Sequence, residues 1–205
     1  MYSHHLKGII MTTTLLRRNQ LPNFLRLTHI NVDVEKLLSC FENKENVADS
    51  ISVDCGSPYL NEAYKQTPVT TTSKKVLYKN GKEDERVYGE LLPEYKGTYV
   101  EEVIGMFKSP VTRVRLVVKE SGAFIKPHID YDTTYSVRYY IPLVTNEWAY
   151  TAVKGKNDKE PEVRHLKADG KAWFVNPGNL HSAWNMGETN DIRLIVACNG
   201  QDDLI

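Results

Sequence analysis

The feature that most constrains the fold is a succession of eight short segments with strand character, which follow one another through the second half of the chain. They span residues 111–119, 123–130, 136–143, 148–153, 162–167, 171–176, 181–186 and 191–198. Polar turn residues separate them, as in the stretch 157–161. Many short strands joined by turns are typical of a barrel or a sandwich. We therefore predict a mainly β fold (α+β) with a β core and flanking helices.

The first 110 residues contain patterns typical of helices, of strands and of loops. Apolar residues at helical spacing predict a helix over 33–43, and Thr98 is placed to cap a second one. Residues 24–30 alternate like a strand that joins the core sheet, whereas residues 44–75 are polar, contain Gly and Pro, and favour a loop. This part of the chain is expected to cover the β core rather than to form one of its own.

An Asn80-Gly81 pair stands between two strand-like arms and predicts a hairpin over residues 76–88. Its Lys- and Glu-rich arms indicate a ribbon that faces solvent, either at a sheet edge or as a lid over the mouth of the barrel. No repeat or low-complexity linker interrupts the chain. We expect a single domain in which residues 1–110, as helices and a hairpin, pack on a core of residues 111–205.

The stretch Pro127-His128-Ile129-Asp130 contains a candidate metal site. Alternate residues of a strand point to the same face, so His128 and Asp130 should lie close together, and His181 at the start of a later strand offers a third ligand. Two histidines and one carboxylate bind one face of Fe(II) and leave positions open for substrate and oxygen. Zinc or manganese would suit the same ligands, and a hydrogen bond between an inward His and Asp is the simpler alternative.

Arg193 is a cation inside the apolar run 192–197. A buried cation is costly unless an anion meets it, and a 2-oxo acid that chelates iron would bring a distal carboxylate to this position. Arg138, in the segment 136–143, is a candidate for a second carboxylate contact, or else an arginine in a surface ion pair. Ser182 is a candidate for hydrogen bonding to the oxo acid or the substrate, or else satisfies backbone at the strand end. Together these residues predict an iron and 2-oxo-acid site.

The charge, hydropathy and cysteine content of the chain limit the partners and the compartment that we expect. The chain has 26 Lys plus Arg and 26 Asp plus Glu, so its net charge gives no reason to expect nucleic acid or an acidic membrane. No apolar run approaches the roughly 18 residues that a membrane span requires. The three cysteines form no CxxC motif or paired framework, which favours a reducing, cytoplasmic setting.

The segment from residue 115 to residue 198 resembles the aspartyl/asparaginyl β-hydroxylase and proline-hydroxylase group of Fe(II)/2-oxoglutarate oxygenases. The matching pieces are residues 128–130, 136–143, 170–173, 181–185 and 192–195. The resemblance implies a double-stranded β-helix (a jelly-roll or cupin-like core) that uses Fe(II), 2-oxoglutarate and O2. It also implies His128, Asp130 and His181 as iron ligands and Arg193 as the anchor of the distal carboxylate. Many relatives carry His where this chain has Tyr140.

The expected activity is therefore hydroxylation of an amino-acid unit, either free or in a peptide or protein, with release of succinate and CO2. Two other classes use the same kind of core. A cupin-like metal enzyme that works without 2-oxoglutarate would not need Arg193. A non-catalytic ligand-binding β-barrel would tolerate the loss of all three metal ligands.

Overall fold

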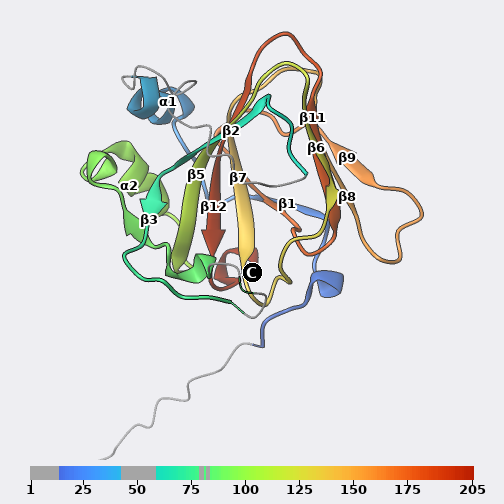
Figure 1. Ribbon diagram of the computed structural model, residues 1–205, viewed down its shortest axis with the longest axis horizontal. Helices are drawn as coiled ribbons and strands as arrows, with labels where there is room; N and C mark the ends of the chain where they lie inside the picture. Colours follow the sequence, from blue (N-terminus) through green and yellow to red (C-terminus); the bar gives the residue numbers. More distant parts are fainter. Residues whose placement is uncertain (1–13, 43–58, 79–80, 82–83) are drawn as a thin grey trace, which may run out of the picture.

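Two antiparallel sheets face each other in the computed structural model, which describes residues 14–42, 59–78, 81 and 84–205 (Figure 1). The major sheet has the strand order β1-β10-β7-β12-β5-β2 and the minor sheet the order β6-β11-β8-β9. Major-sheet strands are β1 (Phe24–Leu27), β2 (Tyr64–Pro68), β5 (Val111–Lys119), β7 (Val137–Val144), β10 (Ala172–Val175) and β12 (Asp191–Cys198). Minor-sheet strands are β6 (Ala123–His128), β8 (Ala149–Lys154), β9 (Glu162–Arg164) and β11 (Leu180–Asn185).

The chain passes back and forth between the two sheets, which is the double-stranded β-helix expected from the sequence. All eight strands predicted after residue 110 are present, with ends that differ by at most three residues from the expected ones. A separate two-stranded sheet joins β3 (Thr70–Thr71) to β4 (Glu90–Leu91). Short 3-10 helices occupy η1 (Arg18–Gln20), η2 (Glu85–Val87), η3 (Pro93–Tyr95) and η4 (Asp202–Leu204).

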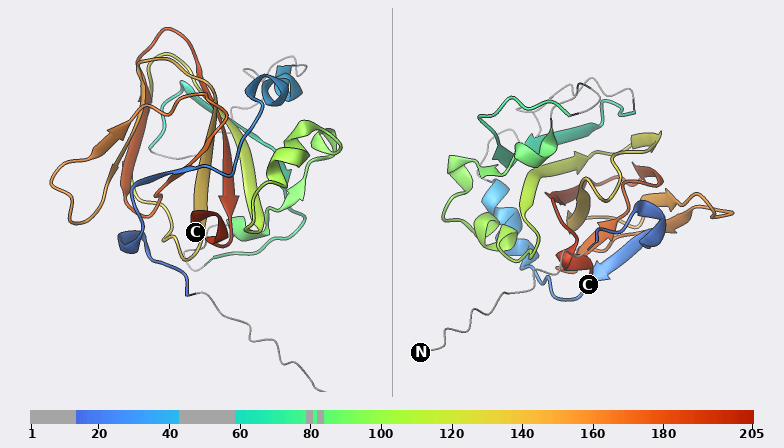
Figure 2. Two further views of the ribbon diagram at one scale, coloured as in Figure 1. Left: turned by 180° about the vertical axis from the view of Figure 1, so that it is seen from behind. Right: turned by 90° about the horizontal axis from the view of Figure 1, so that it is seen from below.

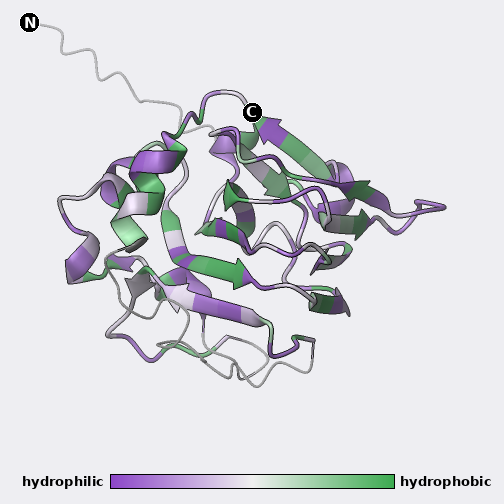
Figure 3. Cartoon of the chain, turned by 90° about the horizontal axis from the view of Figure 1, so that it is seen from above, coloured by the Kyte–Doolittle hydropathy of each residue, from purple (hydrophilic) through white to green (hydrophobic). Residues whose placement is uncertain are grey.

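The hydrophobic core lies on the outer face of the major sheet, beneath the helices α1 (Val34–Glu42) and α2 (Tyr99–Ile104) (Figures 1 and 2). Leu37 of α1 and Val103 of α2 are fully buried against this face. The strand residues in this core include Val114, Leu116, Tyr139, Ile141, Phe174, Leu194 and Val196. Hydrophobic strand segments dominate the centre of the molecule, while the exposed helix surfaces are polar (Figure 3).

The inner face of the same sheet is polar and charged. Because strand side chains alternate between faces, the neighbours of the core residues point into the space between the two sheets. These inward residues include Arg113, Arg115, Lys119, Arg138 and Arg193. The apolar packing outside the sheet therefore supports a polar cavity inside it.

The N-terminus of α2 is capped as the sequence predicts. Thr98 Oγ1 accepts a hydrogen bond from the backbone N–H of Val100 at 3.2 Å and donates one to the carbonyl of Tyr95 at 2.7 Å. Replacing Thr98 with alanine should lower the free energy of unfolding by about 1 kcal/mol, because an orphan N–H loses its partner. Urea unfolding measures this loss, and Thr98→Ser should retain most of the stability; an equal loss in both variants would contradict the capping role.

The loop expected over residues 44–75 is wrong in part, and residues 44–58 of it lie outside the described residues. Residues 64–68, expected in a loop, form β2, an edge strand of the major sheet that pairs with β5. An edge strand with polar side chains on both faces shows no apolar alternation, and it ends at Pro68, which lacks a backbone donor. The predicted helix over 33–43 and the strand within 24–30 are confirmed as α1 and β1.

The expected hairpin over residues 76–88 falls partly outside the described residues, which exclude 79–80 and 82–83. Its second arm contains the 3-10 helix η2, not a strand. Asp84 caps this helix by accepting from the Arg86 N–H at 3.0 Å. Glu85 is only 4% exposed and turns its carboxylate into the cavity, contrary to a ribbon that faces solvent throughout, whereas the next residue, Arg86, is exposed.

Strands from both sides of residue 110 share the major sheet, since β1 pairs with β10 and β2 pairs with β5. The division into an N-terminal part and a core of residues 111–205 stays a prediction. Among the described residues, no helix is long and apolar enough to cross a membrane.

Candidate active site

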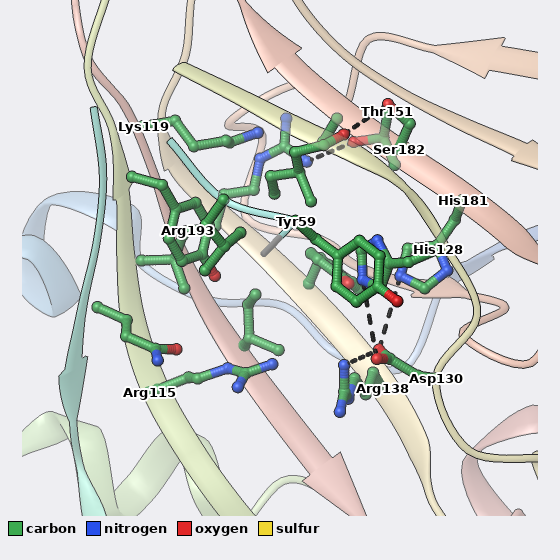
Figure 4. Close-up of a pocket in the computed structure, with 18 of the residues that line it drawn as sticks. Tyr59, Arg115, Lys119, His128, Asp130, Arg138, Thr151, His181, Ser182 and Arg193 are labelled. Carbon is green, nitrogen blue, oxygen red and sulfur yellow. Dashed lines mark hydrogen bonds and ion pairs between the residues drawn. The ribbon is translucent and has the colours of Figure 1, made fainter. Parts of the chain in front are cut away.

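Three predicted ligands converge at one side of the cavity between the sheets (Figure 4). His128 ends β6 and stands directly opposite His181 in the β6–β11 pairing, with ring centroids 4.2 Å apart. Asp130 follows two residues after His128, and its backbone N–H donates to the carbonyl of Pro177 at 2.9 Å. One ligand atom from each of the three residues lies within 4.8 Å of the others. The three side chains are close enough to bind one metal ion between them.

Backbone hydrogen bonds orient both imidazoles. Nδ1 of His128 lies 2.8 Å from the carbonyl of Lys126, and Nδ1 of His181 lies 3.0 Å from the carbonyl of Asn179. A carbonyl only accepts, so each Nδ1 donates its proton to the backbone and Nε2 is the ring nitrogen left to bind a metal. The two Nε2 atoms lie 3.7 Å and 3.6 Å from the Asp130 carboxylate. Burial lowers the pKa of His181 to about 4, which keeps this ring neutral and able to bind a metal.

Arg138 holds the third ligand. Its Nη1 contacts Oδ2 of Asp130, and its Nη2 donates to Oε1 of Glu85 at 2.9 Å. Burial alone would raise the pKa of Asp130, but the Arg138 guanidinium and the two histidines hold it below its ordinary value. Asp130 is therefore ionised and fixed in orientation. Arg138 itself is buried, so the alternative of an arginine in a surface ion pair is wrong.

The carboxylate of Glu85 partly neutralises the positive charge of a group of arginines. Besides Arg138, it faces Arg113, whose Nη1 lies 3.6 Å from Glu85 Oε2. Burial opposes ionisation, yet Arg138, Arg115 and Arg113 hold the pKa of Glu85 below its ordinary value. No described carboxylate lies within ion-pair distance of Arg115, although Arg115 lines the same cavity. This end of the cavity therefore has a surplus of positive charge.

Replacing Arg138 with glutamine should weaken Fe(II) binding by roughly 10- to 100-fold, the usual cost of losing the group that orients a metal ligand. Iron affinity can be measured anaerobically by calorimetry. Arg86→Gln is the matched control, because Arg86 pairs with the neighbouring Asp84 at 2.7 Å and not with Asp130. Equal iron affinity in Arg138→Gln and the wild type would contradict the positioning role.

Arg193 lies in the same cavity, at the opposite end of the row of inward-facing cations from Arg138. It is 1% exposed and crosses from the major to the minor sheet, where its Nη1 donates to Thr151 Oγ1 at 2.8 Å. Its Nε lies 2.9 Å from Oδ2 of Asp191. Among the described residues its buried Nη2 has no hydrogen-bond partner. This nitrogen is a free donor in a dry environment, a feature expected where a ligand anion binds.

The cavity has a volume of about 880 Å³, enough for a small co-substrate together with part of a second molecule. Ser182 lines it, and its hydroxyl donates to the carbonyl of Ile125 at 2.8 Å, which leaves only its oxygen to accept from a ligand. Its contact with the oxo acid stays a prediction. The ring of Tyr59 stacks on His128, with centroids 5.1 Å apart and planes 17° apart.

Sequence analysis missed Lys119, Asp191, Glu85, Thr151, Arg115 and Tyr59 as cavity or site residues. Lys119 Nζ forms an ion pair of 2.5 Å with Asp191 Oδ2, and both side chains are buried. One signal was available for β5, since Arg113, Arg115 and Lys119 recur at even spacing and must share a face. No comparable signal marks Glu85, which reaches the cavity from a 3-10 helix.

A double-stranded β-helix that brings two histidines and a carboxylate together beside an open cavity is typical of the non-heme iron oxygenases. The family model for aspartyl/asparaginyl beta-hydroxylase matches residues 56–200. The chain therefore belongs to this family and is a 2-oxoglutarate-dependent hydroxylase, as the sequence resemblance implied. A comparison with curated proteins finds no match.

The chain is also similar to solved structures. The non-heme alpha ketoglutarate dependent epimerase SnoN from nogalamycin biosynthesis superimposes with a TM-score of 0.52 at 14% identity, covering 88% of this chain and 78% of SnoN. HygX from Streptomyces hygroscopicus, with nickel and 2-oxoglutarate bound, gives a TM-score of 0.49 at 10% identity, covering 85% of this chain and 82% of HygX. At these identities the SnoN likeness supports the double-stranded β-helix fold.

Proposed function

We propose that this hydroxylase binds Fe(II) through His128, Asp130 and His181 and acts on an amino-acid unit, either free or within a peptide. The donor set supports iron, because two imidazoles and one carboxylate on one side of an open cavity suit Fe(II) in oxygenases. When bound, Fe(II) with 2-oxoglutarate and O2 supplies the oxidant that inserts one oxygen atom into a C–H bond, with release of succinate and CO2. The protein residues fix the ligands, bind both substrates and limit the access of water.

The single observation that best supports 2-oxoglutarate as co-substrate is the free Nη2 of Arg193. This buried guanidinium already uses Nε on Asp191 and Nη1 on Thr151, and Nη2 is the one nitrogen without a partner among the described residues. An unsatisfied buried donor costs about 1–3 kcal/mol, which a bound carboxylate removes. We infer that Arg193 binds the distal carboxylate of 2-oxoglutarate.

The arginines near Glu85 support an anionic substrate group, such as the carboxylate of an amino acid. Arg138 was the sequence-based candidate for this contact, but two of its nitrogens are engaged by Asp130 and Glu85. Arg115 is half-buried and faces the same cavity with no described carboxylate in ion-pair distance. Arg115 is the better candidate to bind the substrate carboxylate.

The substrate class can be tested by screening free amino acids and a peptide library for stimulated formation of succinate. We expect a product whose mass increases by one oxygen atom. Arg115→Gln should raise the KM for that substrate while leaving the Kd for 2-oxoglutarate unchanged. Stimulation by nucleotides, lipids or sugars alone would show that the proposed substrate class is wrong while leaving the iron chemistry intact.

A further inference from the structure

Two buried cations and a single carboxylate meet at the end of the cavity that contains Arg193. Lys119, the last residue of β5, is 2% exposed and lines the cavity (Figure 4). In the strand pairing it stands opposite Asp191 of β12, and its Nζ lies 2.5 Å from the Asp191 carboxylate. Arg193 Nε lies 2.9 Å from the same carboxylate oxygen, Oδ2. The three side chains form one cluster, which we call the Lys119–Asp191–Arg193 cluster.

This cluster has an excess of one positive charge. Asp191 can neutralise only one of the two cations, and each of the three side chains is almost completely buried. A buried charge without a partner is strongly unfavourable, so the cluster is one anion short of balance. Burial and the neighbouring Arg193 lower the pKa of Lys119 to about 8, although Asp191 opposes this effect. The positive charge around Lys119 therefore favours the binding of a second anion.

Arg193 shares its guanidinium among several partners. Its Nε and Nη1 already contact Asp191 and Thr151, and its Nη2 has no partner among the described residues. Lys119 contacts the same Asp191 oxygen as Arg193, so it lies close enough to offer a second donor to the same anion. Lys119 carries three N–H groups and has Asp191 as its one anionic partner among the residues that the structure describes.

We propose that Lys119 is a second binding residue for the distal carboxylate of the co-substrate, beside Arg193, and that Asp191 is the counter-ion that holds both cations in place. This inference rests on the proposed function, since it requires a 2-oxo acid at the iron. The cluster then accepts one negative charge and becomes neutral when the co-substrate is bound. It selects a 2-oxo acid with a distal carboxylate over one that ends in a methyl group.

The test compares 2-oxoglutarate with 2-oxopentanoate, which has the same carbon chain but lacks the distal carboxylate. Anaerobic titration of the Fe(II)-loaded protein, followed by calorimetry, gives a Kd for each ligand. Lys119→Met keeps the length of the side chain and removes its charge, leaving Asp191 paired with Arg193. The expected result is a Kd for 2-oxoglutarate that rises roughly 10-fold or more, because a charge-assisted hydrogen bond is lost, and an unchanged Kd for 2-oxopentanoate.

Lys65→Met is the matched control, because Lys65 lies on the adjacent strand β2 and pairs with Glu120 at 2.6 Å outside the cavity. It should change neither Kd. An unchanged Kd for 2-oxoglutarate in Lys119→Met, or an equal loss for both ligands, would overturn the inference and leave the proposed function standing. A wild-type protein that binds no 2-oxoglutarate at all would overturn both.

Asp191→Asn tests the counter-ion role by a measurement that does not depend on turnover. This variant leaves two buried cations without an anion, so the ligand-free protein should melt at a lower temperature than the wild type. Addition of 2-oxoglutarate should then raise its melting temperature by more than it raises that of the wild type. An equal or smaller rise would contradict the proposed charge balance.

Discussion

Replacing His181 with alanine should abolish 2-oxoglutarate turnover and weaken Fe(II) binding by more than about 100-fold, since even the loss of a group that only orients a ligand costs roughly 10- to 100-fold. His181 supplies a neutral Nε2 that points toward the carboxylate of Asp130 at 3.6 Å. Its removal leaves one histidine and one carboxylate, which hold a divalent ion weakly in water. Anaerobic calorimetry with Fe(II) measures the affinity, and succinate formation measures the turnover.

His165→Ala is the matched control for this experiment. His165 is half-buried, and its Nδ1 lies 3.1 Å from the carbonyl of Ala149, but it is not part of the three-residue cluster. Its replacement should leave iron affinity unchanged. Stoichiometric Fe(II) binding with wild-type affinity in a folded His181→Ala protein would exclude His181 as a ligand.

Replacing Arg193 with alanine should raise the Kd for 2-oxoglutarate by roughly 100-fold or more, because the charge-assisted contact of a buried guanidinium is lost. Fe(II) affinity should change little, since Arg193 contacts Asp191 and Thr151 rather than the metal ligands. In the variant Asp191 remains paired with Lys119, so no buried carboxylate is left alone. Titration of the iron-loaded protein with 2-oxoglutarate measures the effect.

Arg164→Ala serves as the control for the loss of an arginine, because Arg164 lies on β9 and forms an exposed ion pair with Glu162. If Arg193→Ala binds 2-oxoglutarate with wild-type affinity, Arg193 is not the anchor. The predicted pattern is specific: a changed Kd for the co-substrate, an unchanged Kd for iron, and no effect of Arg164→Ala.

Most strands of the core were predictable because they bear the alternation or the apolar content of a buried strand, and turn residues mark their ends. β5 and β12 begin and end at the predicted residues. The edge strand β2 was not predictable in this way, since one of its faces borders the cavity and its side chains, such as Gln66, are polar. The helix η2 was missed because Glu85 is held by Arg138 and Arg113, partners that are distant in sequence.

Some residues of the candidate site were predictable from the sequence and others were not, for the same reason. His128 and Asp130 were predictable because their two-residue spacing alone places them together, and Arg193 because it is a cation in an apolar strand. The pairing of Lys119 with Asp191 depends on the register between β5 and β12, which the sequence does not specify. Arg138 was placed in the cavity correctly, but its contacts with Asp130 and Glu85 depend on how three separate segments meet.

The most direct test of the central claim is anaerobic addition of 2-oxoglutarate to the Fe(II)-loaded wild-type protein. Chelation of iron by the 1-carboxylate and the 2-oxo group should produce a weak visible metal-to-ligand charge-transfer band, which His181→Ala should not show. A cupin-like enzyme that does not use 2-oxoglutarate, or a ligand-binding barrel without iron, gives no such band. Appearance of the band with one 2-oxoglutarate per iron is the predicted result, and its absence from the folded, iron-loaded wild type would contradict the proposed iron and 2-oxoglutarate site.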